Sequence, residues 1–158
     1  VQADVLNYIP NQKASQLAFD SGLVADGKDW CDIHPKTFES KLVKNVHVIG
    51  DASNAAPMPK SAFSASTQGK VVALQIARML KQQEPLNPPK LANTCYSLLS
   101  PNYGISIAAV YNALDAKIQN FDGAGLVSPE TDPDGHIRIL EAKYAYAWYE
   151  SQTADIFK

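Results

Sequence analysis

The chain has 158 residues, of which 46% are hydrophobic and 19% are charged, a composition that is typical of a folded globular protein and argues against disorder. Its formal net charge of −2 predicts no nucleic-acid partner, and no apolar run approaches the ~20 residues that a membrane span needs. Cys31 and Cys95 are too few for a disulfide framework and lack zinc spacing. The three histidines also share no metal-binding pattern, so we predict no metal site.

The first part of the chain predicts short elements joined by loops. Residues 3–9 are mostly apolar and predict a buried strand, and residues 12–21 predict a helix that stops at Gly22. Cys31, beside a tryptophan, is most simply a small buried hydrophobic residue. Because the chain opens at Val1 inside the predicted strand and lacks an initiator methionine, we expect a fragment of a longer protein.

The middle of the chain carries the strongest ligand-site pattern. A β-rich run, residues 46–49, stops at Gly50 and Asp51, and after a loop with two prolines a long helix is predicted from about Ser61 to Lys81. Ligands of open α/β sheets lie outside the carboxyl ends of the strands, and the first N–H groups of a helix have no partner within it. This pattern favours a nucleotide site in which Asp51 accepts hydrogen bonds from sugar hydroxyls. The alternative is an ordinary turn in which Asp51 only caps the chain.

Two further expectations concern this helix and the segment after it. Gln68 lies two turns into the helix and is expected to face solvent or a neighbouring segment. Residues 82–90 contain three prolines, which is typical of a semi-rigid connector. We therefore predict two domains, residues 1–84 and residues 85–158.

After the connector, the sequence predicts a small sheet and a helix. Residues 91–99 and 105–111 predict two strands that pair as a hairpin, and residues 112–134 predict a loop. Residues 136–140 alternate and predict a third strand, and residues 141–157 predict an aromatic-rich helix. The expected fold class is α+β: an incomplete α/β piece, followed by a small domain with a three-stranded antiparallel sheet and a carboxyl-terminal helix.

The sequence has no G-x-G-x-x-G, P-loop or G-x-S-x-G motif, so a dinucleotide phosphate loop would have to lie outside this chain. Cys95 lies in a polar frame, NTCYS, and is either a half-buried strand cysteine or a redox nucleophile, which needs access and a readily formed thiolate. Trp148 is a core residue more often than a cofactor partner, and the tyrosines around it would form either a packing face or a docking surface.

Three blocks of the sequence together resemble the flavoprotein subunit of flavocytochrome c sulfide dehydrogenase. The blocks are VHVIGDASNAAPMPKSAFSASTQGK, NTCYSLLSPNYGISIAAVY and YAYAWY. The resemblance runs from ADVLNYIPNQKA to the last helix and is weakest over residues 112–134. It implies that residues 1–84 are the carboxyl-terminal part of a glutathione-reductase-like FAD-binding domain. Residues 85–158 would be the smaller domain that covers the flavin and contacts a cytochrome.

The resemblance also implies where FAD would bind. Gly50 and Asp51 match the Gly-Asp of such flavoproteins, and Asp51 would hold the ribityl chain. Lys60, Ser61 and Ala62 would lie along the isoalloxazine, with backbone N–H groups aimed at its pyrimidine edge. A helix amino terminus there would stabilise the negative charge of reduced flavin.

The resemblance assigns the chemistry to Cys95 and Trp148. Cys95 matches a redox cysteine that forms a disulfide with a cysteine upstream of Val1, which makes Cys31 an unlikely partner. Sulfide would attack that disulfide, and two electrons would pass through FAD to a cytochrome c subunit. Trp148 would lie near the flavin and the disulfide.

The resemblance further implies a periplasmic protein, and this chain alone would be inactive because the phosphate loop and the second cysteine are missing. Two alternatives stay open at this point. One is a sulfide:quinone oxidoreductase, which predicts an amphipathic carboxyl-terminal anchor; the ending AWYESQTADIFK is short and not basic, which counts against it. The other is a non-catalytic module that docks a protein partner through its aromatic helix.

Overall fold

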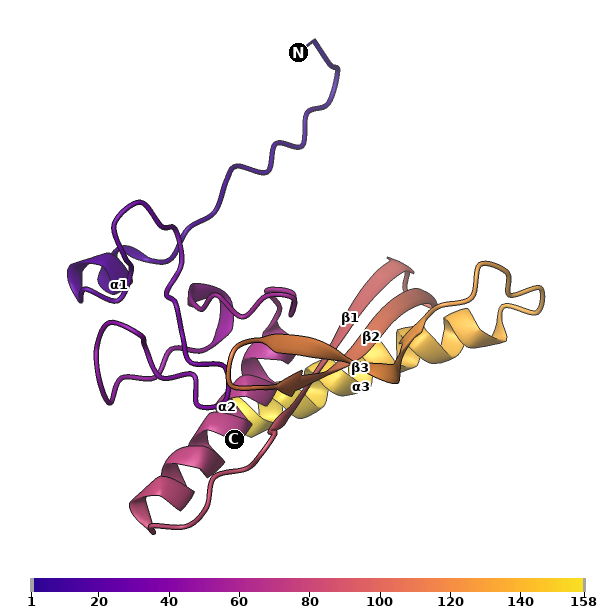
Figure 1. The fold of residues 1–158 in the computed structure, drawn as a ribbon. Helices are drawn as coiled ribbons and strands as arrows, with labels where there is room; N and C mark the ends of the chain where they lie inside the picture. The colour runs from indigo at the N-terminus through magenta and orange to yellow at the C-terminus, as the bar shows by residue number, and fades with distance from the viewer. Residues whose placement is uncertain (1, 158) are drawn as a thin grey trace.

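The structure, a computed structural model, describes residues 2–157. It contains one three-stranded antiparallel sheet in the order β1-β2-β3, together with two long helices (Figure 1). This confirms the predicted α+β class, with its small antiparallel sheet and its carboxyl-terminal helix. The elements in chain order are α1 (Gln16–Asp20), η1 (Gly50–Ala52), α2 (Ala62–Leu80), β1 (Lys90–Ser100), β2 (Tyr103–Ala113), β3 (Ile118–Val127) and α3 (His136–Phe157).

The hairpin is confirmed, and both of its strands are longer than the sequence indicates. β1 and β2 pair antiparallel from Lys90 opposite Asn112 to Ser100 opposite Tyr103, with one irregularity after Leu98. Side chains alternate between the two faces of a strand. One face of β1 therefore meets α2, and the other face meets α3, near the edge of the sheet that β1 forms.

The third strand lies where the sequence predicts a loop. β3 occupies residues 118–127, and the predicted strand at residues 136–140 is instead the first turn of α3. Gly123 and Gly125 make the sequence of β3 resemble a loop. The absence of a side chain at Gly125 nevertheless lets its backbone pair closely with β2, because a Cβ there would lie 3.1 Å from the Ala108 carbonyl oxygen. Residues 136–140 alternate as a strand would, but they form a helix. The Asp132 carboxylate accepts the Arg138 N–H at 2.9 Å and so stabilises the start of that helix.

The predicted helix over residues 61–81 is confirmed as α2. Ser61 caps it, since its hydroxyl accepts the Ser64 N–H at 3.0 Å. Gln68 is buried and accepts the Gly50 N–H at 2.7 Å, so it faces a neighbouring segment and the solvent-facing alternative is wrong. About two turns later, Gln75 is also buried and exchanges hydrogen bonds with the backbone of Leu86 at 2.9 and 3.2 Å.

The amino-terminal part contains less regular structure than the sequence predicts. Residues 3–9 are exposed and form no strand, and Figure 1 shows them leaving the body of the protein as an extended segment. Val1 lies outside the described residues. The helix predicted over residues 12–21 shortens to α1, although Gly22 does follow its end at a φ of 67°. Residues 46–49 make only an isolated bridge, from His47 to Glu39.

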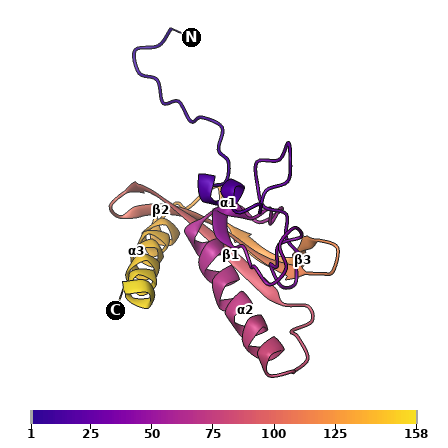
Figure 2. The same ribbon diagram turned by 90° about the vertical axis from the view of Figure 1, so that its left-hand side faces the viewer.

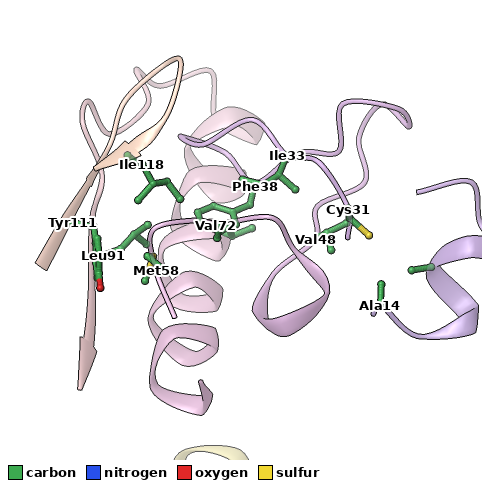
Figure 3. Close-up of a cluster of buried hydrophobic side chains, with 13 residues drawn as sticks. Ala14, Cys31, Ile33, Phe38, Val48, Met58, Val72, Leu91, Tyr111 and Ile118 are labelled. Carbon is green, nitrogen blue, oxygen red and sulfur yellow. The ribbon is translucent and has the colours of Figure 1, made fainter. Parts of the chain in front are cut away.

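A single cluster of buried side chains joins the loops to α2 and to the sheet (Figure 3). Phe38 and Cys31 are fully buried in the loop region, which confirms Cys31 as a small buried residue. Val72 of α2 and Leu91 of β1 extend the cluster toward the sheet, where Tyr111 also belongs to it. The cluster contains residues from before and after the connector at residues 82–90. The division into two domains at residue 84 stays a prediction.

A buried polar cluster anchors α3 to the sheet. Glu141 accepts the hydroxyl hydrogens of Ser106 at 2.8 Å and Ser128 at 2.5 Å, and it pairs with Arg138 at 3.2 Å. Burial alone would raise the pKa of Glu141, but the hydrogen bonds from Ser128, Ser106 and Arg138 outweigh it and hold that pKa below its ordinary value.

The seam between α3 and the hairpin also depends on the absence of a side chain at Gly104. A Cβ there would lie 2.8 Å from the Ala142 backbone nitrogen. We predict that Gly104→Ala lowers the free energy of unfolding by about 1–3 kcal/mol in denaturant titrations, because helix backbone must move. Gly69→Ala is the control, since its Cβ would meet only the mobile end of Ile49 and alanine favours helix. A Gly104→Ala protein as stable as the parent would contradict this packing.

A second prediction uses the lowered pKa of Glu141. A carboxylate with a lowered folded pKa stabilises the protein fully above its ordinary value of about 4.5, and the contribution is lost as the pH falls through the folded value. We expect Glu141→Gln to cost about 2 kcal/mol at neutral pH and to remove this part of the acid dependence in unfolding titrations. Glu150→Gln, at an exposed site on the same helix, should change neither quantity.

Candidate functional site

A hollow of about 640 Å³ lies between the start of α2, the edge strand β1 and the face of α3. Figure 2 shows α2 and α3 as neighbouring helices, and Lys70 and Asp155 link them by an ion pair of 2.8 Å. The lining of the hollow is mainly apolar and aromatic, which suits a planar organic ring. The residues that matter here are Ser61, Ala62, Cys95, Tyr96 and Trp148.

Trp148 forms the aromatic wall between the two helices. Its ring stacks on Phe63 of α2 with centroids 5.5 Å apart and planes 16° apart, and Tyr96 of β1 lies at 6.4 Å. Burial raises the pKa of Tyr96, so its hydroxyl stays protonated. Trp148 is half-buried, which leaves part of its ring facing the hollow.

The amino end of α2 supplies hydrogen-bond donors at the hollow. Ser61 has an extended backbone and satisfies the Ser64 N–H with its side chain. Among residues 2–157, no acceptor meets the N–H groups of Ala62 and Phe63. Together with the helix dipole, these two N–H groups can bind an anionic or carbonyl-bearing edge of a ligand.

Cys95 is a free, exposed thiol on the wall of the hollow. The Asn93 amide nitrogen donates to its sulfur at 3.2 Å. Cys31 is free as well, but it is fully buried among the loops. Only Cys95 of the two therefore combines access with a polar partner, which are the conditions for thiol chemistry.

A second hollow, of about 440 Å³, is lined by residues that come just before Ser61 in the chain. Asp51, Lys60 and Trp30 are among its lining residues. The Lys60 amine donates to the carbonyl oxygens of Asp51 at 2.6 Å and Ser53 at 2.9 Å, and it lies 3.7 Å from the centre of the Trp30 ring. Partial burial lowers the pKa of this amine, while the Asp51 carboxylate opposes the change. The Asp51 side chain is exposed and available to a ligand.

The structure divides the predicted site residues between the two hollows. Ser61, Ala62, Cys95 and Trp148 line the first, and Asp51 and Lys60 line the second. Gly50 lines neither; it lies at a φ of 66°, where a Cβ would come within 3.2 Å of Ala65, and Gln68 holds its N–H. The two hollows adjoin in sequence at Lys60 and Ser61, but the assignment of these residues to a bound cofactor stays a prediction.

Sequence reasoning missed several residues that shape the site. Asn93 precedes Cys95 by two positions on a predicted strand. Because side chains alternate between the two faces of a strand, the sequence indicates that these two residues share a face. Phe63 and Trp30 carried no comparable signal, because only packing brings them to Trp148 and Lys60. Among the described residues, no group of His, Cys, Asp and Glu side chains could hold a metal ion, and no helix is long and apolar enough to cross a membrane.

One comparison with known proteins bears on this site. Residues 87–157 match the family model described as flavocytochrome c sulphide dehydrogenase, flavin-binding. The matched segment contains the whole sheet, α3, Cys95 and Trp148, whereas Gly50 to Ala62 lie before it. A flavin is the kind of planar ring that the aromatic hollow suits, so the site and the match agree. Residues 87–157 are thus similar to the flavin-binding family of flavocytochrome c sulphide dehydrogenase, the family that the sequence blocks resemble.

Proposed function

We propose that this chain is part of a flavoprotein that oxidises sulfide through a redox disulfide and FAD and passes the electrons to a cytochrome c subunit. One observation carries the proposal: the exposed thiol of Cys95, the ring of Trp148 and the open start of α2 meet in one hollow. The first two belong to the segment that matches a flavin-binding family. Each of the three has a distinct part in the proposed reaction.

The shape of the site supports FAD as the cofactor. An elongated cofactor that followed the chain from Asp51 to Ala62 would pass from the second hollow into the first. The Asp51 carboxylate would accept hydrogen bonds from the ribityl hydroxyls. The isoalloxazine would lie against Trp148, with its pyrimidine edge toward the N–H groups of Ala62 and Phe63. When bound, the flavin accepts two electrons at once and gives them up singly.

The proposed role of Cys95 follows from the access to its thiol and from its place on the wall of the hollow. In the complete protein, Cys95 would form a disulfide with a cysteine from an amino-terminal segment outside this chain. Attack by hydrosulfide forms one S–S bond and breaks another, which leaves a persulfide on one cysteine and a thiolate on the other. The two electrons that sulfide gives up remain with that thiolate. Cys31 does not suit the partner role, because its side chain is fully buried.

Two further parts of the proposal concern the setting of the reaction. Disulfides persist most readily in an oxidising compartment, and a periplasmic location is consistent with the proposed redox disulfide. The cytochrome c subunit and the amino-terminal half of the flavoprotein would be the partners, with sulfide as the substrate. Without that half, this chain alone would not oxidise sulfide. The proposal calls for no nucleic acid, and for no metal ion held by this chain.

Cys95→Ser tests this function in the complete flavoprotein. We expect anaerobic sulfide to bleach the visible flavin absorbance of the parent and oxidised cytochrome c to restore it, whereas Cys95→Ser retains its flavin and is not bleached, because a hydroxyl cannot form the disulfide. Cys31→Ala is the matched control and should bleach like the parent.

Other outcomes would replace the proposal. Undiminished bleaching in Cys95→Ser would remove this residue from the reaction. Recovery with a quinone, and not with cytochrome c, would favour a sulfide:quinone oxidoreductase. A colourless complete protein would favour the non-catalytic docking module, with the aromatic face of α3 as its surface.

Asp51→Ala tests the placement of the cofactor independently of sulfide. Loss of a charge-assisted hydrogen bond should weaken FAD binding by about 1.5–3 kcal/mol, which is roughly a tenfold to hundredfold higher dissociation constant. Flavin retained after extensive dialysis measures the effect. Asp122→Ala removes an exposed carboxylate on β3 and should leave retention unchanged. Full occupancy in Asp51→Ala would place the ribityl chain elsewhere.

A further inference from the structure

Asn93 is a buried polar side chain whose amide oxygen is held by α2. Only 3% of its surface is exposed. Its Oδ1 accepts the hydroxyl hydrogens of Ser61 at 2.5 Å and Ser64 at 3.0 Å. Ser61 at the same time caps α2, so its own position is fixed by the helix. These bonds attach β1 directly to the first turn of α2.

The two hydroxyls determine where the rest of the amide points. Because the oxygen faces Ser61 and Ser64, the NH₂ group faces the opposite direction and meets the Cys95 sulfur at 3.2 Å. Alternate residues of a strand share a face, so Asn93 and Cys95 point the same way from β1. The sulfur therefore receives a donor of fixed direction from a side chain that water does not reach.

We propose that Asn93 is a positioning residue for Cys95. It links the sulfur to the amino end of α2 and supplies an N–H donor that fixes the direction of the sulfur. The proposal rests on the proposed function, in which opening of the disulfide leaves a thiolate. It adds the group that orients that sulfur and stabilises its charge, since a hydrogen bond to a charged atom is stronger than one to a neutral atom.

The neighbouring Thr67 provides a comparison within the same seam. Its hydroxyl donates to the Ala92 carbonyl oxygen at 2.8 Å and also joins α2 to β1, but the contact ends on the backbone. Loss of this bond loosens the seam without touching the sulfur. Thr67→Val therefore separates a general effect of α2–β1 packing from a specific effect on Cys95.

The test is the alkylation rate of Cys95 in the full, reduced chain, measured with iodoacetamide by mass spectrometry of the Cys95 peptide over a range of pH. Asn93→Asp keeps an acceptor for both serine hydroxyls but lacks the N–H donor. We expect its rate to fall about tenfold over that pH range. Thr67→Val should keep the parent rate and profile.

Two results would overturn the proposal. One is a folded Asn93→Asp protein, verified by circular dichroism, whose Cys95 reacts like the parent. If that variant does not fold, Ser64→Ala removes one of the hydroxyls that orient the amide, and an unchanged rate there would equally reject it. The assay needs neither flavin nor sulfide. A failed bleaching experiment with an intact Asn93 effect would therefore reject the proposed function and leave the positioning role in place.

Discussion

The first turn of α2 is the constraint on which the site depends. Ser61 accepts the Ser64 N–H and donates its own hydrogen to Asn93, so one side chain both starts the helix and attaches it to β1. If this joint moved, the free N–H groups of α2 and the sulfur of Cys95 would lose their relation to each other. A capping serine is worth about 1 kcal/mol to a helix. Here the same residue also sets the geometry of the hollow, which a helix cap alone would not require.

In the loop region, buried side-chain amides form hydrogen bonds with backbone groups that a neighbouring strand would bond in a larger sheet. Gln68 holds the N–H of Gly50, and Gln75 holds the backbone of Lys36 and Leu86. Each satisfies backbone groups that have no ladder partner, at the cost of burying a polar side chain that must be fully paired. This explains why a segment with only isolated bridges can keep Asp51 and Lys60 beside α2.

Local patterns predicted the parts of the fold that local interactions determine, namely α2, the hairpin and the carboxyl-terminal helix. They failed where a partner decides the outcome. Residues 3–9 carry an apolar run but have no strand beside them in the described chain, and β3 contains two glycines but pairs with β2. The same limit applies to the site. Alternation places Asn93 and Cys95 on one face, whereas only the packing of α3 brings Trp148 to Phe63.

The position of Trp148 is in turn set at the far end of α3. Gly104 lets the helix backbone approach β2, and Glu141 holds the hydroxyls of Ser106 and Ser128 beneath it. Two turns further along the helix, Trp148 reaches Phe63 and closes the hollow against α2. The aromatic wall and the thiol thus reach the hollow through separate supports, one on each face of β1. A flavin between them would be held by two elements with separate supports, so loss of either support should open the hollow without unfolding the other.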